Sequence, residues 1–415
     1  MNYTRIAVLK TVISSFRWKP LVKILNKLII TKWKNRILTV LFSDRQPLEI
    51  GLEENTSILG NIYIGKVNRI VKNLNSAFVD FEKGQTGYYS LSDNPCILYA
   101  DGHEGTLKAG DEIIVQVARD AVRTKDPVLS SNLNFTGQYG VLTARKTIVG
   151  FSSRISDKAW KEQLRPVLEA ALQDEAGLIV RTNAYGHEEQ LLDELKKLQV
   201  LYRNVRQAAA YRTCYSLLYR PDPEYIKTIR SCPLGSLKEI VTDVPEVFEQ
   251  LRLYFDSCGP EQQCSFRLYE DSMICLSNLY SLESVMDRAC QKRVWLKSGG
   301  YLVIEYTEAM VVIDVNTGKY SGKKNQEDTI RMTNREAAEE ISRQLRLRNL
   351  SGIIMVDFID MKRQEDKNEL MDYLKRLVRH DPVKTTVVDM TQLNLVEITR
   401  KKEKKPLWEQ ISQKE

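Results

Sequence analysis

Two aspartates, each placed directly after an apolar run, are the residues of this sequence best suited to chemistry. Asp314 follows Val311–Ile313, and Asp357 follows Ile354–Val356. If the two carboxylates lie together, they repel each other and are costly to remove from water unless a cation lies between them. Mg²⁺ suits this place because it prefers oxygen ligands and typically takes one or two carboxylates together with several waters. Asn316 could then orient one of the carboxylates.

A Mg²⁺ ion held in this way would support hydrolysis of a phosphodiester. Water on the metal is a nucleophile, and the ion stabilises the charge that develops on the phosphate. The alternative is structural: one aspartate caps a loop and the other pairs with an arginine. The spacing of the residues does not decide between these two interpretations.

The elements around the two aspartates are expected to bring them together. Residues 301–316 indicate two strands, residues 326–352 a helix that stops at Gly352, and residues 353–357 a further strand. The apolar face of that helix consists of Ile330, Ala337, Ile341 and Leu345. A strand–helix–strand order predicts parallel neighbours joined by a right-handed crossover, so both carboxyl ends lie at one edge of the sheet.

Between the first aspartate and the helix, residues 317–325 have the sequence TGKYSGKKN. A phosphate-binding loop of the Walker A type needs GxxxxGK followed by Ser or Thr, and here Gly318 and Gly322 are too close together. That interpretation therefore fails. Lys319, Lys323 and Lys324 remain candidates for holding a polyanion beside the acids.

A second pattern, earlier in the chain, indicates a small antiparallel barrel. Short strands are expected within residues 61–91 and at residues 111–118, separated by Asn and Gly turns. The pattern resembles an S1-type OB-fold, a barrel that binds single-stranded RNA by stacking bases on exposed aromatic rings. Phe78 and Tyr88 would form this platform, and Lys125 would contact the RNA backbone. The alternative interpretation places both rings in the core of the barrel.

The rest of the chain is less informative. Strands are expected at residues 28–31 and 37–42, and residues 158–227 are predicted to be mostly helical, with a leucine stripe that belongs to the core. Residues 233–300 predict little. Residues 1–25 are basic with apolar residues near helical spacing, which could be a membrane-surface segment, an organelle-targeting peptide or an unstructured extension.

Composition limits the class of protein. The chain has 415 residues, of which 43% are hydrophobic and 28% charged, and this excludes collagen-like, mucin-like and fully disordered proteins. The net charge of +7 arises at the two ends, because the body between them is slightly acidic. The seven cysteines never form CxxC, so we expect reduced thiols and no zinc site. No secretory signal or long apolar run is present, so we expect a cytoplasmic protein.

Residues 313–361 closely resemble the catalytic segment of the ribonuclease E/ribonuclease G endonucleases. The run EAAEEISRQLRLRNLSGIIMVDFIDM is highly specific, the S1-like barrel precedes it, and LNLVEITRKK follows it as the family's "LLEM-[ST]-R" element does. The similarity runs from about residue 26 to residue 402.

The resemblance implies a multidomain α/β fold. An RNase H-like subdomain (residues 26–60 and 228–289) would be interrupted by an S1-type OB-fold barrel (61–131), followed by a 5′-sensor region (132–227) and a DNase I-like catalytic subdomain (290–400). A basic extension (1–25) and a basic tail (401–415) would flank them. The implied activity is an endoribonuclease that cuts single-stranded A/U-rich RNA, in rRNA and tRNA processing and mRNA decay, leaving a 5′-phosphate and a 3′-hydroxyl.

The resemblance also implies roles for residues. Asp314 and Asp357 would bind Mg²⁺, with Asn316 as the orienting amide. A pocket that holds a 5′-monophosphate would use Gly137, Val141, Arg181, Thr182 and Lys384. An arginine fork and a hydroxyl are suitable phosphate ligands.

Three departures from the family pattern have consequences. Lys384 stands where the family has an arginine, which keeps the charge but loses bidentate geometry and weakens the expected 5′-end preference. In GFSSRIS only Arg154, an expected RNA contact, remains of two adjacent basic residues. No CPxC motif follows residue 400, which argues against zinc and a zinc-linked tetramer while leaving a homodimer open. We also expect no long scaffold for degradosome partners.

Two alternatives to an endoribonuclease remain open. The chain could be a non-catalytic protein that binds single-stranded RNA and keeps the nuclease fold, although retention of Asp314, Asn316 and Asp357 argues against this. It could also be a nuclease that associates with membranes through residues 1–25.

Overall fold

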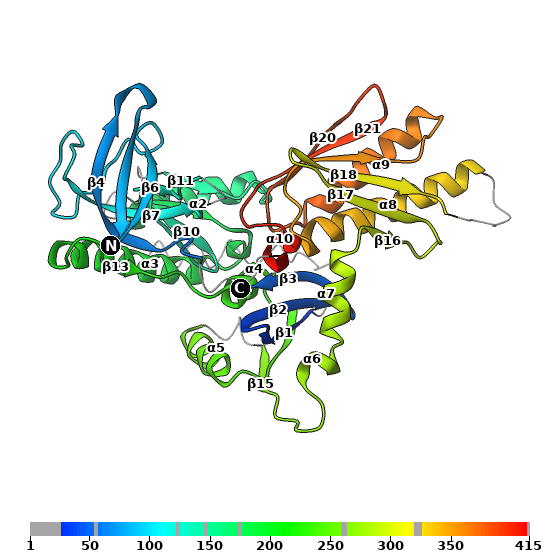
Figure 1. Cartoon of the computed structure of the whole chain (residues 1–415), viewed down its shortest axis with the longest axis horizontal. Helices are drawn as coiled ribbons and strands as arrows, with labels where there is room; N and C mark the ends of the chain where they lie inside the picture. The colour runs from blue at the N-terminus through cyan, green and yellow to red at the C-terminus, as the bar shows by residue number, and fades with distance from the viewer. Residues whose placement is uncertain are drawn as a thin grey trace.

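The computed structural model describes residues 26–53, 57–121, 125–144, 148–172, 176–258, 264–318 and 326–412. The predicted basic extension (residues 1–25) and the three candidate lysines Lys319, Lys323 and Lys324 lie outside these ranges. Figure 1 shows three lobes that meet near the short helices α4 (Glu224–Ser231) and α10 (Leu407–Ser412). A barrel lobe is at the left, a sheet backed by two long helices is at the right, and the sheet that contains the first strand is at the bottom.

The lower lobe is built on a five-stranded sheet of order β15-β14-β1-β2-β3. These strands are β1 (Asn26–Trp33), β2 (Arg36–Ser43), β3 (Gln46–Leu52), β14 (Leu237–Thr242) and β15 (Ser265–Leu268). One face is covered by α4 (Glu224–Ser231) and α5 (Pro245–Ser257). The other face is covered by α6 (Leu276–Leu279), α7 (Leu282–Cys290) and α10 (Leu407–Ser412). Both faces of the sheet are covered, so the consecutive residues Leu28–Thr31 of β1 are all buried.

Five strands form the closed barrel that the sequence predicts, and the closure is consistent with an S1-like OB-fold. They are β4 (Ile62–Val71), β5 (Ser76–Glu82), β6 (Gln85–Ser90), β7 (Glu112–Arg119) and β8 (Val128–Ser130). The order β4-β5-β6-β8-β7 is closed by pairing of β4 with β7, and β13 (Leu217–Tyr219) adds to the open side of β4. The strands of the barrel pair antiparallel, as expected, except β6 and β8, which are parallel. A short 3-10 helix, η2 (Lys72–Leu74), joins β4 to β5. A Cβ atom at Gly65 would lie 2.6 Å from Val79, so the barrel closes this tightly only with glycine there.

A four-stranded sheet of order β11-β12-β10-β9 follows the barrel. Its strands are β9 (Asn134–Thr136), β10 (Gly140–Thr143), β11 (Val149–Phe151) and β12 (Gly177–Val180). The helices beside it are α2 (Lys158–Ala171), α3 (Glu188–Tyr211) and the 3-10 turn η3 (Thr182–Ala184). The leucine stripe of α3 is buried, as expected. The prediction of a mostly helical segment over 158–227 is incomplete, because β12 and β13 also lie there.

The right-hand lobe contains a six-stranded sheet of order β16-β17-β18-β19-β21-β20, which we call the carboxylate sheet. Its strands are β16 (Arg293–Trp295), β17 (Tyr301–Tyr306), β18 (Met310–Asn316), β19 (Gly352–Asp357), β20 (Thr385–Met390) and β21 (Leu395–Arg400). The helices α8 (Gln326–Leu347) and α9 (Gln364–Val378) pack on one face, through a core that includes Ile304, Ile313, Ile341 and Leu374. The opposite face is not covered by these helices.

The expected end of the helix before β19 is wrong. Helix α8 ends at Leu347, and Asn349 takes the left-handed conformation (φ 49°) that closes it. Gly352 is instead the first residue of β19, with φ 89°. Asparagine tolerates the left-handed region better than most residues, so it can replace glycine at this position.

The last described residues are part of the folded body. Leu407 is buried against the core of the lower lobe, and the ring of Trp408 packs on Tyr306 of β17, with their centroids 5.3 Å apart. Helix α10 therefore joins the lower lobe to the carboxylate sheet. All seven cysteines are free thiols. Among the described residues, no helix combines the length and the apolar character needed to cross a membrane.

Candidate active site

The two aspartates stand side by side at the same edge of the carboxylate sheet. Strands β18 and β19 are parallel, as predicted, and Asp314 is the register partner of Asp357. The side-chain amide of Asn316 donates a hydrogen bond of 2.6 Å to Oδ2 of Asp314. One oxygen of Asp314 is therefore held by Asn316, and the other oxygen is left for a further partner.

The electrostatics of this edge favour a cation. Partial burial raises the pKa of Asp357, and the negative charges of Asp314 and Asp360 raise it further. A bound cation would relieve this repulsion. Among the described residues no group of three or more His, Cys, Asp and Glu side chains is arranged to hold a metal by itself. Mg²⁺ commonly binds one or two protein carboxylates and completes its coordination shell with water. The two carboxylates present here therefore fit that ion.

Buried contacts behind the edge fix the position of the strand that carries Asp357. Asn334, on α8, is fully buried, and its side chain donates to the carbonyl of Ile359 at 2.8 Å and accepts from the amide of Ile359 at 3.1 Å. The loop that follows Asp357 is therefore tied to α8. A Cβ at Gly318 would lie 2.3 Å from the carbonyl oxygen of Gly299, so the backbone after Asn316 passes the β16–β17 loop more closely than any other residue would allow.

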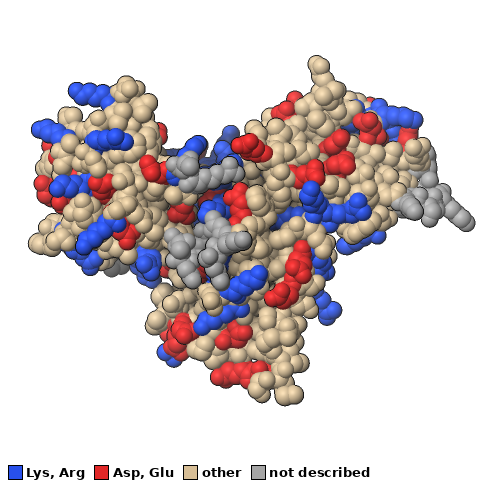
Figure 2. Space-filling view, viewed as in Figure 1, with Lys and Arg blue, Asp and Glu red and all other residues tan. Residues whose placement is uncertain are grey.

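The candidate RNA platform lies on the barrel. Phe78 and Tyr88 are cross-strand partners on β5 and β6, both partly exposed, with their ring centroids 6.2 Å apart in a near-perpendicular arrangement. The guanidinium of Arg69 lies 4.5 Å from the centroid of the Phe78 ring. Lys125 is exposed and precedes β8. The barrel and the carboxylate sheet lie in separate lobes, and Figure 2 shows the surface hollowed between them.

The residues expected to hold a 5′-phosphate come mainly from the four-stranded sheet. Arg181, directly after β12, donates through Nη1 to the carbonyl oxygen of Gly137 at 2.5 Å. Thr182 follows it at the start of η3, and Val141 lies on β10, which pairs with β12. The structure therefore groups these four residues. Lys384 is exposed and belongs to the carboxylate-sheet lobe, just before β20.

Sequence patterns did not identify Glu194, which shapes this loop. Its carboxylate accepts hydrogen bonds from the backbone amides of Gln138, Tyr139 and Gly140 at 2.5, 2.8 and 3.0 Å. Burial raises the pKa of Glu194, and the three amide donors partly offset that rise. A Cβ on Gly137 would lie 2.3 Å from the Glu194 carboxyl carbon, so glycine is required there.

Arg154 lies in the turn after β11, the strand that pairs in parallel with β12, which leads to Arg181. It is close enough to Arg181 and to Asp381 of the carboxylate-sheet lobe for their charges to affect one another. Arg154 therefore faces the boundary between two lobes. Asp360 is a further residue that no sequence pattern identified, although its position shortly after Asp357 could have indicated it. Asp360 accepts a hydrogen bond of 3.1 Å from Asn394.

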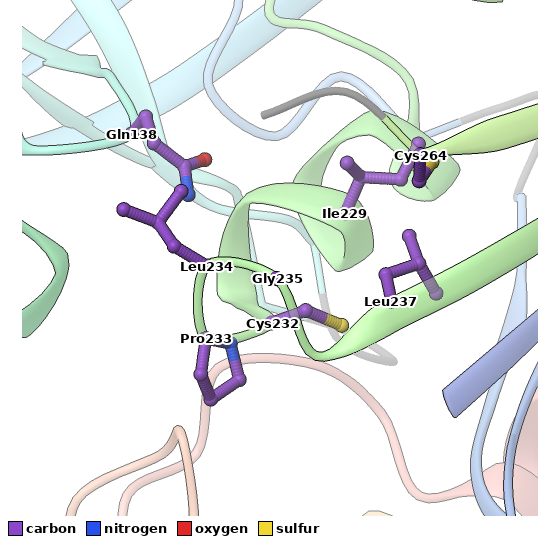
Figure 3. Close-up of a pocket in the computed structure, with 8 residues that line it drawn as sticks. All are labelled: Gln138, Ile229, Cys232, Pro233, Leu234, Gly235, Leu237 and Cys264. Atoms are coloured by element: carbon purple, nitrogen blue, oxygen red, sulfur yellow. The ribbon is translucent and has the colours of Figure 1, made fainter. Parts of the chain in front are cut away.

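A small pocket lies away from the aspartates, where the Gln138 loop meets the lower lobe (Figure 3). Cys232, Leu237 and Cys264 are among its lining residues, and none of the lining residues is charged. Burial raises the pKa of the Cys232 thiol to about 12, which leaves it protonated at neutral pH. Burial also raises the pKa of the Cys264 thiol, to about 11, so neither thiol of the pocket is a nucleophilic thiolate at neutral pH.

Comparison with known proteins identifies related sequences. A family model described as "Ribonuclease E/G family" matches residues 134–403. The chain is 32% identical over 390 residues to a protein named Ribonuclease G from Haemophilus influenzae, covering 91% of this chain and 79% of that protein. It is 32% identical over 369 residues to Ribonuclease G from Escherichia coli K12 (86% and 75%) and 31% identical over 395 residues to Ribonuclease E from Synechocystis (93% and 58%).

Proposed function

The chain belongs to the ribonuclease E/G family, and from this premise we propose that it is a Mg²⁺-dependent endoribonuclease. It hydrolyses single-stranded, A/U-rich RNA, leaves 5′-phosphate and 3′-hydroxyl ends, and acts in rRNA and tRNA processing and mRNA decay. The observation that carries the proposal is the register pairing of Asp314 with Asp357 next to Asn316. Two carboxylates side by side at the end of parallel strands favour a cation between them, and phosphodiester hydrolysis is a reaction that such a cation serves.

In this proposal Asp314 and Asp357 hold the ion, and Asn316 keeps the Asp314 carboxylate in one orientation. When bound, the ion supplies a water that is a nucleophile near neutral pH and neutralises charge that develops on the phosphate. The chain itself positions the RNA. Phe78 and Tyr88 stack against bases, which selects single strands because bases in a duplex already stack on one another.

The proposal includes stimulation by a 5′-monophosphate. Arg181 and Thr182 supply donors of the kind that bind phosphate oxygens. Lys384 contributes charge from the neighbouring lobe, as a point charge without the planar fork of arginine. We therefore expect a 5′-end preference that is present but weaker than an arginine at this position would give.

The test is cleavage of a short A/U-rich RNA in the presence of Mg²⁺, with either a 5′-monophosphate or a 5′-hydroxyl. An Asp314→Asn chain and a chelator are the controls. We expect cleavage by the wild-type chain, faster for the monophosphate, and none by the variant, which should still bind RNA. Cleavage that survives in the variant would contradict the metal assignment. Equal rates for the two ends would remove the 5′-sensor, and binding without any cleavage would favour the non-catalytic alternative.

A further inference from the structure

An exposed aromatic cluster lies on the carboxylate sheet, outside the site already described. Trp295, on the edge strand β16, is 64% exposed. Its ring packs against Tyr301 of β17, with centroids 5.3 Å apart and planes inclined by 61°. The guanidinium of Arg293 lies 4.6 Å from the Tyr301 centroid and 5.7 Å from the Trp295 centroid. We call these three residues the edge cluster.

Strand register places the edge cluster on the same face as the two aspartates. Arg293 pairs with Val303, Val303 with Asp314, and Asp314 with Asp357, so these four residues form one row across the sheet. Directly paired residues, and residues two apart along a strand, share one face.

The adjacent row runs from Trp295 to Tyr301 and then to Asn316. Since each of these residues is two positions from a member of the first row, both rows share the face of the aspartates. The alternate residues, such as Leu302, are buried under α8 and α9 on the other face. The edge cluster is therefore level with Asn316 and the aspartates on the face that the helices leave uncovered.

The distance between the edge cluster and the strand that carries Asp314 also suits neighbouring nucleotides of one RNA strand. Strands β16 and β18 are two strand spacings apart, which is about 10 Å. A short stretch of single-stranded nucleic acid spans such a distance, so one strand could contact the carboxylate pair and the edge cluster at the same time.

The chemistry of the edge cluster matches an unpaired nucleotide. A large exposed indole beside a second ring offers a flat surface on which a base can stack, and stacking tolerates any base. No ion pair involves Arg293 among the described residues, and Glu305 of the adjacent strand β17 is paired with Lys292 instead, at 3.1 Å. The charge of Arg293 is therefore available to a phosphate next to that base. An apolar partner surface would leave this charge without a partner, whereas a polyanion complements it.

We propose that Arg293, Trp295 and Tyr301 form a second stacking platform that binds a nucleotide of single-stranded RNA beside the phosphodiester to be cut. This inference rests on the proposed function. It gives the barrel and the carboxylate sheet separate tasks: the barrel platform holds one part of the strand, and the edge cluster fixes the strand next to the metal ligands. The edge cluster thereby sets which bond is presented to Asp314 and Asp357.

The experiment combines protein variants with substrate variants. A set of short A/U-rich RNAs carries one abasic nucleotide at successive positions, and binding of each to the full-length chain is measured by fluorescence anisotropy in a chelator, where no cleavage occurs. The chains are wild type, Trp295→Ala, Trp295→Phe and Tyr211→Ala. Tyr211 is the matched control because it is an exposed aromatic at the end of α3, outside the carboxylate sheet. Cleavage with Mg²⁺ is measured on the same set.

We expect Trp295→Ala to weaken binding of the intact RNA by about 5- to 150-fold, with most of the loss restored in Trp295→Phe. One abasic position should weaken wild-type binding by a similar factor and have no further effect on Trp295→Ala, because both changes remove the same stack. That position should be adjacent to the cut observed with Mg²⁺. Tyr211→Ala should match the wild type.

The proposal would be overturned if, at every abasic position, the loss of affinity in Trp295→Ala and the loss from the abasic nucleotide multiplied to within about twofold of the combined loss. A Trp295→Ala chain that binds RNA like the wild type would also overturn the proposal. The same holds if Trp295→Ala changes subunit association in sedimentation while no abasic position is coupled to it, and that result would assign the cluster to a contact between copies of the chain. If one abasic position is coupled to Trp295→Ala in binding but the wild-type chain cleaves no RNA, the proposed nuclease activity would be rejected and the stacking platform would be kept.

Discussion

Removing the amide of Asn316 should raise the Mg²⁺ concentration that cleavage requires. In the structure this amide donates to Oδ2 of Asp314 at 2.6 Å, a short bond to a charged acceptor. Such a bond contributes about 1.5–3 kcal/mol. If Asn316→Ala removes it, the Asp314 carboxylate gains freedom to rotate away from the direction in which it would face a metal.

The magnitude follows from that bond. A loss of 1.5–3 kcal/mol corresponds to about a 10- to 150-fold weaker interaction, and loss of a residue that orients a metal ligand typically costs about 10- to 100-fold in affinity. Asp314 is only half-buried, so water can replace part of the lost donor. We therefore expect the half-saturating Mg²⁺ concentration to rise near the lower end, by about tenfold, with RNA affinity unchanged.

The assay is the initial rate of RNA cleavage as a function of Mg²⁺ concentration. The matched control is Asn394→Gly. Asn394 likewise donates to an aspartate of this edge, Asp360, at 3.1 Å, yet Asp360 is not one of the two proposed ligands, and glycine accommodates the φ of 62° at this position. Its Mg²⁺ curve should stay close to that of the wild type.

A second variant separates orientation from direct ligation. Asn316→Asp cannot donate to Asp314 and places a like charge beside it, so it should weaken Mg²⁺ at least as much as the alanine variant does. Tighter Mg²⁺ in Asn316→Asp would show that residue 316 contacts the ion itself. An Asn316→Ala curve that coincides with the wild type would refute the orienting role.

Three further outcomes are expected. Arg400 and Asp381 are 3% and 6% exposed and form an ion pair of 2.7 Å. Arg400→Met should therefore lower the free energy of unfolding by about 3–5 kcal/mol, because it leaves a buried charge without its partner. Amide exchange of β20 and β21 that matches the wild type would contradict this. The hydrogen bond to Ser277 lowers the pKa of Cys275, whereas burial raises the pKa of Cys232. Iodoacetamide at pH 7, followed by mass spectrometry, should therefore label Cys275 well before Cys232. The reverse order would be incompatible with the structure. Phe78→Ala should weaken binding of single-stranded RNA by about 1–3 kcal/mol in anisotropy titrations, and an unchanged Kd would assign that ring to the fold alone.

Sequence patterns were sufficient for elements whose apolar residues recur with a clear helical or strand period. The apolar runs before Asp314 and Asp357, with a helix between them, predicted parallel strands, and the register pairing agrees. The closed barrel likewise follows from short alternating runs and turns. The sequence predicts that α8 stops at Gly352, because glycine is the commonest residue after a helix, whereas Asn349 provides the positive φ.

Other features depend on contacts that no local pattern contains. Glu194 lies in a helix whose leucines predict core packing, and its bonds to the 138–140 amides join positions more than fifty residues apart. Strand β16 has only three residues, which is too short for any periodicity, so Trp295 becomes interpretable only when it is paired with Tyr301. The roles of the metal ligands and of the 5′-sensor residues stay predictions.

The order of strands in the lower lobe has a consequence for synthesis of the chain. Strand β1 is central, with β2 on one side and β14 on the other, yet the barrel, the four-stranded sheet and their helices are made between β3 and β14. At 5–20 residues per second, a ribosome takes about 10 to 40 s to pass from Leu52 to Leu237. During that interval the apolar edge of β1 that β14 later covers lacks its partner, and an uncovered strand edge can pair with other chains. Slow translation of the insertion would lengthen that exposure, so the nascent chain should depend on chaperones most while its middle is being made.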